Sequence, residues 1–220
     1  MSTGYTSFDF SVLSPRDAYK LLIGTVVPRP IALVTTVDLE GRVNAAPFSF
    51  FNCLTADPPI LALGIENHAD MSFKDTAGNI RTTEEFTVNI VDDALVEGMN
   101  TCAVAFPADI DELQAAGLTA VPGTSVSRPR IAEAPASFEC RRHMTIELGR
   151  SREIVLGRVL RLDIRSDLVD AERKHVDQHA LRAVGRMGGH GYSRTSDLFD
   201  LATPSVDEWR ALAASTAQAD

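Results

Sequence analysis

Cysteine is scarce in this sequence, and positive charge is outweighed by negative charge. The only cysteines are Cys53, Cys102 and Cys140, which lie far apart and form no Cys-x-x-Cys pair. That spacing argues against a disulfide framework and against a structural zinc site. The formal net charge is -9, from 21 lysines and arginines against 30 aspartates and glutamates. A chain with this charge repels phosphate backbones, so we expect no nucleic-acid partner.

Long apolar runs are also absent, and no stretch is long enough to cross a bilayer. The segment Met1 to Phe10 lacks the basic start and the apolar core of a signal peptide. No Gly-x-Gly-x-x-Gly motif follows a first strand, which disfavours a Rossmann domain. We therefore expect a cytoplasmic protein that has no membrane partner.

The sequence does contain enough apolar residues for a full core. Hydrophobic residues make up 45% and charged residues 23% of the 220 residues, which is close to an average globular protein. No internal repeat or shift in composition divides the chain. We expect a single domain over residues 1–220.

The order of local patterns favours a β-rich fold. A helix is predicted after Ser14, which is a good N-cap and precedes Pro15. Pro28-Arg29-Pro30 then imposes an extended chain. Strands are predicted over residues 31–37, 43–46, 60–65, 86–91, 138–148 and 153–164. Short strands joined by hairpin turns favour an antiparallel barrel over a parallel sheet, and Gly157 inside the last strand indicates a bulge or a close backbone approach.

Helices are predicted around this barrel. Asp92 or Asp93 could cap one helical stretch, and Asp109 another that ends at Gly117. A short C-terminal helix is expected around Trp209. The fold class is therefore mainly β, an antiparallel barrel with peripheral helices (α+β).

Polar residues that suit a phosphate are concentrated between Asn44 and Thr76. Ser49 and Asn52 offer neutral hydrogen bonds, and Lys74 and Thr76 offer a cation and a hydroxyl near a possible helix start. Neutral donors, one cation and backbone N–H groups together are what a phosphate requires. Turns around Pro47 and Pro58 would contain similar residues for structural reasons alone, and spacing does not separate the two interpretations.

An ordered series of motifs resembles the flavin reductase-like family, which has an FMN-binding split barrel, and its flavoredoxin group. The resemblance covers nearly the whole chain. The motifs are Pro28-Arg29-Pro30-Ile31-Ala32-Leu33-Val34-Thr35-Thr36, Asn44-Ala45-Ala46-Pro47-Phe48-Ser49-Phe50-Phe51, Asp57-Pro58-Pro59, Lys74-Asp75-Thr76, Asn79, Phe86-Thr87-Val88-Asn89, Gly185-Arg186-Met187-Gly188-Gly189 and Tyr192.

The resemblance implies an antiparallel split β-barrel, a homodimer, and FMN bound without a covalent link near the subunit interface. It places Arg29 and Thr36 near the isoalloxazine or ribityl chain, and the backbone of Ala45 and Ala46 at the polar edge of the ring. It assigns the phosphate to Ser49, Asn52, Lys74 and Thr76. The full set of implied cofactor-binding residues is Arg29, Thr35, Thr36, Asn44, Ala45, Ala46, Ser49, Phe50, Asn52, Lys74, Asp75 and Thr76.

The implied activity is that of an NAD(P)H-dependent flavin reductase. NADH or NADPH would deliver hydride to the flavin, and a flavin-dependent monooxygenase could accept the reduced product. Two alternatives stay open: an electron carrier or flavoenzyme for a small organic substrate that keeps FMN bound, and a non-catalytic flavin-binding protein. Residues 97–135 match no motif, and we expect them to shape access to the substrate.

Three of the five histidines are candidates for catalysis or metal binding. His190 lies between glycines, which allow close approach to a ligand, so a contact with nicotinamide or substrate is one interpretation. The other is that the glycines only form a turn and His190 points to solvent. His175 and His179 have a spacing that can bind zinc in a helix, but no third ligand is nearby. A solvated helix face is the simpler interpretation, and we predict no metal site.

Overall fold

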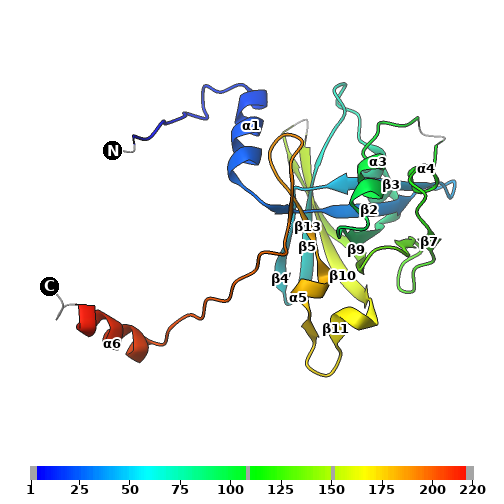
Figure 1. The fold of residues 1–220 in the computed structure, drawn as a ribbon. Helices are drawn as coiled ribbons and strands as arrows, with labels where there is room; N and C mark the ends of the chain where they lie inside the picture. Colours follow the sequence, from blue (N-terminus) through cyan, green and yellow to red (C-terminus); the bar gives the residue numbers. More distant parts are fainter. Residues whose placement is uncertain (1–3, 108–109, 150–151, 217–220) are drawn as a thin grey trace.

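The structure is a computed structural model that describes residues 4–107, 110–149 and 152–216. Its main element is an antiparallel sheet of seven strands in the order β3-β2-β6-β9-β10-β5-β4 (Figure 1). The strands are β2 (Ala32–Val37), β3 (Val43–Phe48), β4 (Phe51–Ala56), β5 (Pro59–Glu66), β6 (Glu85–Ile90), β9 (Ala136–Leu148) and β10 (Arg152–Ile164).

Small sheets and short helices surround this sheet. One three-stranded sheet joins β1 (Arg29–Pro30), β13 (Val184–Arg186) and β14 (Tyr192–Arg194). Two-stranded pairs are formed by β7 (Ala120–Val121) with β8 (Arg130–Ile131) and by β11 (Val169–Asp170) with β12 (His175–Val176). The helices are α1 (Pro15–Thr25), α2 (Asp75–Thr83), α3 (Val96–Thr101), α4 (Glu112–Ala115), α5 (Gln178–Leu181), α6 (Val206–Thr216) and the 3₁₀ helix η1 (Ser166–Leu168).

Strand β2 separates two hydrophobic cores, because successive side chains of a strand point to opposite faces. Ala32 and Val34 belong to a core inside the barrel, around the fully buried Phe86. Leu33 belongs to a second core beneath α3 and α4. Every residue of β2 is therefore buried, which explains why this segment reads as a continuous apolar and β-branched run.

The bulge or close backbone approach predicted at Gly157 is confirmed. The pairing of β10 with β9 shifts between Leu156 and Gly157, as expected for a bulge. A Cβ atom added at Gly157 would lie 2.2 Å from Cζ of Phe86, which real Cβ atoms essentially never do. The barrel core therefore requires glycine at this position.

Replacing Gly157 with alanine should lower the free energy of unfolding by about 1–3 kcal/mol, because an overpacked core must move the Phe86 ring. Urea denaturation would measure this loss. Combining the change with Phe86→Leu should cost less than the sum of the two single changes, because the shorter side chain leaves room for the methyl group. Additive losses would show that the ring does not limit the site.

Most sequence expectations for the fold are confirmed. Ser14 caps α1, and its Oγ accepts a hydrogen bond of 3.1 Å from the backbone N–H of Asp17. The β2–β3 turn and the long β9–β10 hairpin also form as predicted. Strand β4 was missed, because all of its residues except Phe51 are exposed and give no apolar alternation.

Three helix predictions need correction. The N-cap of α3 is Leu95, not Asp92 or Asp93, and Asp92 instead accepts from the backbone N–H groups of Ala94 and Leu95 in the preceding turn. The N-cap of α4 is Asp111, whose Oδ1 accepts from the backbone N–H groups of Leu113 and Gln114. Asp109, the predicted cap, lies outside the described residues. His175 and His179 do not share a helix, because His175 lies in β12 and a new cap at Asp177 starts α5.

The loop between β7 and β9 is fixed by a buried carboxylate. Glu139 on β9 has no exposed surface, and its two oxygens accept from the backbone N–H groups of Thr124, Ser125 and Val126. Thr35 holds the same loop, since its Oγ1 donates to the carbonyl oxygen of Pro129. This long loop is therefore an ordered part of the barrel wall.

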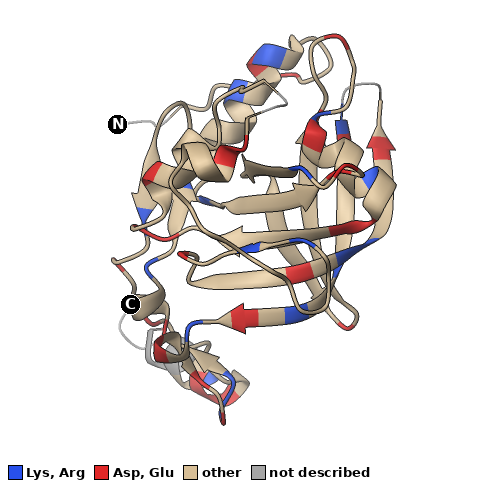
Figure 2. Ribbon diagram, turned by 90° about the vertical axis from the view of Figure 1, so that its right-hand side faces the viewer, with Lys and Arg blue, Asp and Glu red and all other residues tan. Residues whose placement is uncertain are grey.

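The two ends of the chain extend from the barrel on the same side (Figure 1). Among the described residues, no helix combines the length and apolar character needed to cross a membrane. In the view of Figure 2, basic and acidic segments are interspersed along the coloured strands instead of gathering into a basic stripe.

Candidate functional site

A cavity of about 240 Å³ lies at the start of α2, and we call it the α2 cavity. Five of the predicted cofactor residues line it: Asn44, Ala46, Lys74, Asp75 and Thr76. Strand β3 brings the first two to the cavity, and the N-terminus of α2 brings the other three. Its other lining residues are Pro47, Phe48, His68, Cys102, Ala103, Val104, Ala105, Phe106 and Glu112.

The start of α2 has the features of an anion site. Lys74 is its N-cap and makes no side-chain cap hydrogen bond, so the first backbone N–H groups are not capped by a side chain. Within the described part of the chain, no carboxylate lies within ion-pair distance of Lys74. A helix N-terminus with a neighbouring cation is suited to a phosphate group.

A hydrogen-bond network fixes the polar wall of the α2 cavity. Asn44 Nδ2 donates to Thr76 Oγ1 at 3.0 Å and to Thr36 Oγ1 at 3.2 Å. The buried Asn79 also donates to Thr36, at 3.0 Å. Thr36 itself has no exposed surface, so it orients Asn44 instead of reaching the cavity.

Glu112 brings a negative charge to the same cavity. Its Oε2 accepts a hydrogen bond of 3.1 Å from the backbone N–H of Ala45. Burial raises the pKa of the Glu112 carboxyl above its usual range, and the hydrogen bond from Ala45 opposes this shift. The cavity is therefore lined by one lysine, Lys74, and by two carboxylates, Glu112 and Asp75.

A second cavity of about 200 Å³ adjoins the first, and we call it the tail cavity. It shares Pro47, Phe48 and Ala103 with the α2 cavity, so the two cavities are neighbours, and we call the pair the groove. Its remaining lining residues are Ile31, Ser49, Met99, Asn100, Arg186 and Tyr192.

The glycine-rich tail forms a turn at the edge of the tail cavity. Arg186 fixes this turn by donating to the carbonyl oxygens of Gly189 and Gly191, and its guanidinium lies 4.5 Å from the centre of the Tyr192 ring. Tyr192 in turn donates to Asn100 at 3.4 Å. His190 is exposed in the turn and lines neither cavity.

Arg29 joins parts of the chain that are distant in sequence. Its Nη1 donates to the carbonyl oxygens of Ile23 and Val26, at 2.7 and 2.8 Å, and its Nη2 donates to that of Met187 at 3.0 Å. Its Nε contacts Ser49 Oγ at 3.4 Å. The guanidinium is thus engaged by the protein, between α1 and the tail.

The predicted cofactor residues therefore fall into three groups. Asn44, Ala46, Lys74, Asp75, Thr76 and Ser49 line the groove. Arg29, Phe50 and Asn52 line, together with Ser49, a separate cavity of about 320 Å³ beside β1. Thr35 and Thr36 of β2 and Ala45 of β3 are fully buried and stay predictions as cofactor contacts.

Several groove residues carried no readable sequence signal. The segment Cys102 to Phe106 and Glu112 come from the region that matched no motif, and they line the α2 cavity. Glu112 meets Ala45 across 67 residues of sequence, so only the tertiary fold brings them together. Burial raises the pKa of the Cys102 thiol to about 12, which makes it an inert part of the wall.

In the ranges that the structure describes, no group of three or more His, Cys, Asp or Glu side chains could hold a metal ion.

Comparisons with known proteins point to one family. Residues 23–179 match the family model described as Flavin reductase like domain. The fold resembles component B of nitrilotriacetate monooxygenase from Bacillus cereus, with a TM-score of 0.87 and 32% identity, covering 91% of this chain and 100% of that chain. It also resembles the 2-nitrobenzoate 2-nitroreductase NbaA from Pseudomonas fluorescens, with a TM-score of 0.85 and 37% identity, covering 91% and 98%. A Shewanella frigidimarina chain with a split barrel domain, 21% identical, has a TM-score of 0.77 and covers 88% and 96%. The observed antiparallel fold is therefore a split barrel.

Proposed function

The chain belongs to the flavin reductase-like domain family, and from that membership we propose that it binds FMN and reduces it with NADH or NADPH. The observation that supports FMN most directly is the α2 cavity, where Lys74 and the N-terminus of α2 offer a site for the phosphate. The adjoining apolar residues Ala46, Pro47 and Phe48 suit a flat ring.

The protein's part in this activity is binding and orientation. The chemistry that FMN supplies when bound is hydride acceptance at its N5 atom and onward electron transfer. Lys74 and Thr76 would hold the phosphate, and Asn44 would be kept in place by Thr36 and Asn79. The segment Cys102 to Phe106 would exclude water from one wall. Hydride transfer does not require a proton donor among the groove side chains.

Absorption spectroscopy of the purified protein, before and after NADH is added, tests this proposal. We expect a flavin spectrum that bleaches with NADH or NADPH, and steady-state NAD(P)H oxidation when FMN is supplied. A yellow protein that neither bleaches nor turns over would favour the non-catalytic alternative. A protein that bleaches but does not release FMN would favour the bound electron carrier. A protein that binds no flavin would refute the proposal.

A second candidate activity is reduction of a small aromatic acid while FMN stays bound. It is favoured by the 37% identity to a chain named for 2-nitrobenzoate reduction. Arg186 and Tyr192 in the tail cavity offer a cation and an aromatic face for such a substrate. NADH consumption that depends on 2-nitrobenzoate, without added FMN, would support it.

We also propose a symmetric homodimer, and a flavin-dependent monooxygenase as acceptor of the reduced flavin. The outer side of the β9 end exposes Met144, Ile146 and Leu148, by 51%, 40% and 50%, which suits contact with another protein surface. Light scattering should give twice the chain mass of 23.8 kDa. The monooxygenase is suggested by the likeness to a component of such an enzyme.

His190 is proposed to contact the nicotinamide, since it is exposed on the turn that Arg186 fixes beside the tail cavity. Replacing His190 with alanine should slow flavin reduction about tenfold or more, or about 1.4 kcal/mol of barrier. The FMN affinity should stay within about 0.5 kcal/mol, as for a surface site away from the bound cofactor. Stopped-flow bleaching measures the rate, and His179→Ala, at another exposed histidine, is the control. An unchanged rate would leave His190 without a catalytic role.

A further inference from the structure

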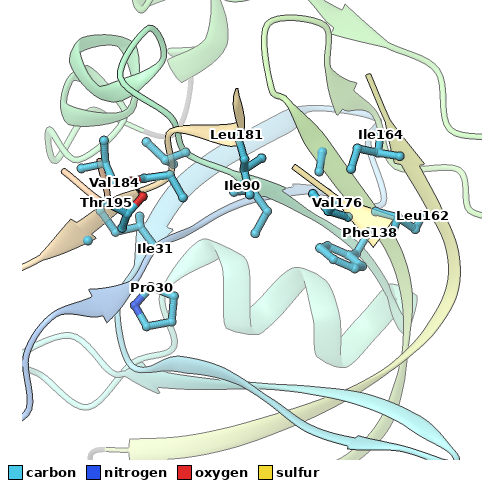
Figure 3. A pocket seen from close by; sticks show the side chains of 14 residues that line it. Pro30, Ile31, Ile90, Phe138, Leu162, Ile164, Val176, Leu181, Val184 and Thr195 are labelled. Carbon is cyan, nitrogen blue, oxygen red and sulfur yellow. Dashed lines mark hydrogen bonds between the residues drawn. The ribbon is translucent and has the colours of Figure 1, made fainter. Parts of the chain in front are cut away.

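An apolar concavity of the structure lies outside the groove. This apolar pocket has a volume of about 330 Å³ and shares only Ile31 with the tail cavity (Figure 3). Phe138, Leu162 and Ile164 from the long hairpin lie at one end, and Val184 and Thr195 at the other (Figure 3). The pocket opens to solvent and its lining is almost wholly apolar, so a water molecule would find few hydrogen-bond partners in it.

The C-terminal arm, residues 196–216, leaves the barrel at the edge of this pocket. It begins directly after Thr195, which lines the pocket, and runs away from its own barrel (Figure 1). Phe199 and Leu201 are 84% and 85% exposed, and Trp209 on α6 is 61% exposed. An isolated helix as short as α6 is marginal in water, so the arm needs a surface to pack on.

The charges of the arm and of the pocket rim are complementary. The arm contains four acidic residues and one basic residue: Asp197, Asp200, Asp207, Glu208 and Arg210. Arg182 and Arg194 flank the lining residues Leu181 and Thr195, and both pair with the single carboxylate of Asp93, at 2.7 and 3.0 Å. Beside Leu181 and Thr195, two arginines therefore share one carboxylate, which favours an acidic segment at this side of the pocket.

We propose that the arm of one copy occupies the apolar pocket of a second copy, and that the two copies exchange arms. Phe199 lies four positions after Thr195, which is at most about 14 Å of extended chain. The partner's pocket must then lie close to the arm's own starting point. A two-fold axis near Thr195 meets this condition and fills both pockets at once. This inference rests on the proposed dimer and is independent of the flavin chemistry.

Crosslinking of two differently marked chains tests the exchange. In a Cys53→Ser background, which removes the exposed native thiol, one chain carries Ala202→Cys on the arm and the other Gln178→Cys beside the pocket on α5. The chains are co-expressed and treated with a short bis-maleimide. We expect a product of twice the chain mass that contains both chains. Replacing both Phe199 and Leu201 with serine should reduce its yield at least fivefold, and Leu39→Cys in the β2–β3 turn, used in place of the arm cysteine, should give none.

Each other outcome overturns the proposal. A chain that carries both cysteines and crosslinks only within itself would mean that the arm packs on its own barrel. A dimer by light scattering with no crosslink would leave the dimer in place and remove the arm from its interface. A monomer would remove both. The only tryptophan, Trp209, gives an independent readout: its emission should shift to longer wavelength when dilution separates the copies.

Discussion

Replacing Lys74 with alanine should weaken FMN binding by about 1.5–3 kcal/mol, the range for a hydrogen bond to a charged group, or roughly 10- to 150-fold in Kd. Lys74 lines the α2 cavity at the N-terminus of α2, where a phosphate would meet both the ammonium group and the uncapped backbone N–H groups. Riboflavin lacks the phosphate, so its binding should change little. Titration of the apoprotein with both flavins, followed by fluorescence quenching, measures the two values.

Two matched variants sharpen this experiment. Lys20→Ala removes an exposed lysine of α1 that pairs with Asp17, and it should leave both flavins unaffected. Glu112→Gln keeps an acceptor for the backbone N–H of Ala45 but removes one of the two carboxylates that line the α2 cavity, so FMN binding should tighten. Equal losses for FMN and riboflavin in Lys74→Ala would move the phosphate away from Lys74.

Replacing Glu139 with alanine should lower the free energy of unfolding by about 3 kcal/mol or more, because the buried carboxylate accepts from three backbone N–H groups that would lose their acceptor together. Glu139→Gln keeps one acceptor oxygen and should cost less. Denaturant unfolding gives the stabilities, and amide exchange at residues 124–126 should quicken in both variants.

Glu133 provides the control for this prediction. It accepts from one backbone N–H, that of Thr119, at a more exposed position. Glu133→Ala should therefore cost about 1 kcal/mol or less. If Glu139→Ala cost no more than Glu133→Ala, the loop would be held by its other contacts, such as the bond from Thr35 to Pro129.

Local sequence patterns predicted the parts of the fold that local physics determines. The cap at Ser14, the β2–β3 turn and the β9–β10 hairpin depend on neighbouring residues and on alternation along a strand. Strand β4 has neither signal, because it is exposed and is held by pairing with β5. The cap of α4 was misplaced because several aspartates compete in that segment, and only packing of Leu113 selects Asp111.

The sequence predicted which residues form the candidate site better than it predicted how they are arranged. The motif residues Asn44, Lys74 and Thr76 do meet in one cavity. Arg29 looked equally suited to a ligand, but its guanidinium is used by carbonyl groups of α1 and of the tail. Such partners lie up to 158 residues away along the chain, so no spacing rule could reveal them.

The hydrogen bonds of Arg29 couple the local unfolding of α1 to that of the glycine-rich tail turn. Arg29 binds the carbonyl oxygens of Ile23 and Val26 on one side and that of Met187 on the other. If either α1 or the tail turn detaches, Arg29, a residue that is only 6% exposed, loses partners for its guanidinium, which must be rehydrated. The free energy of local opening is therefore shared, and the two segments should behave as one cooperative unit in hydrogen exchange.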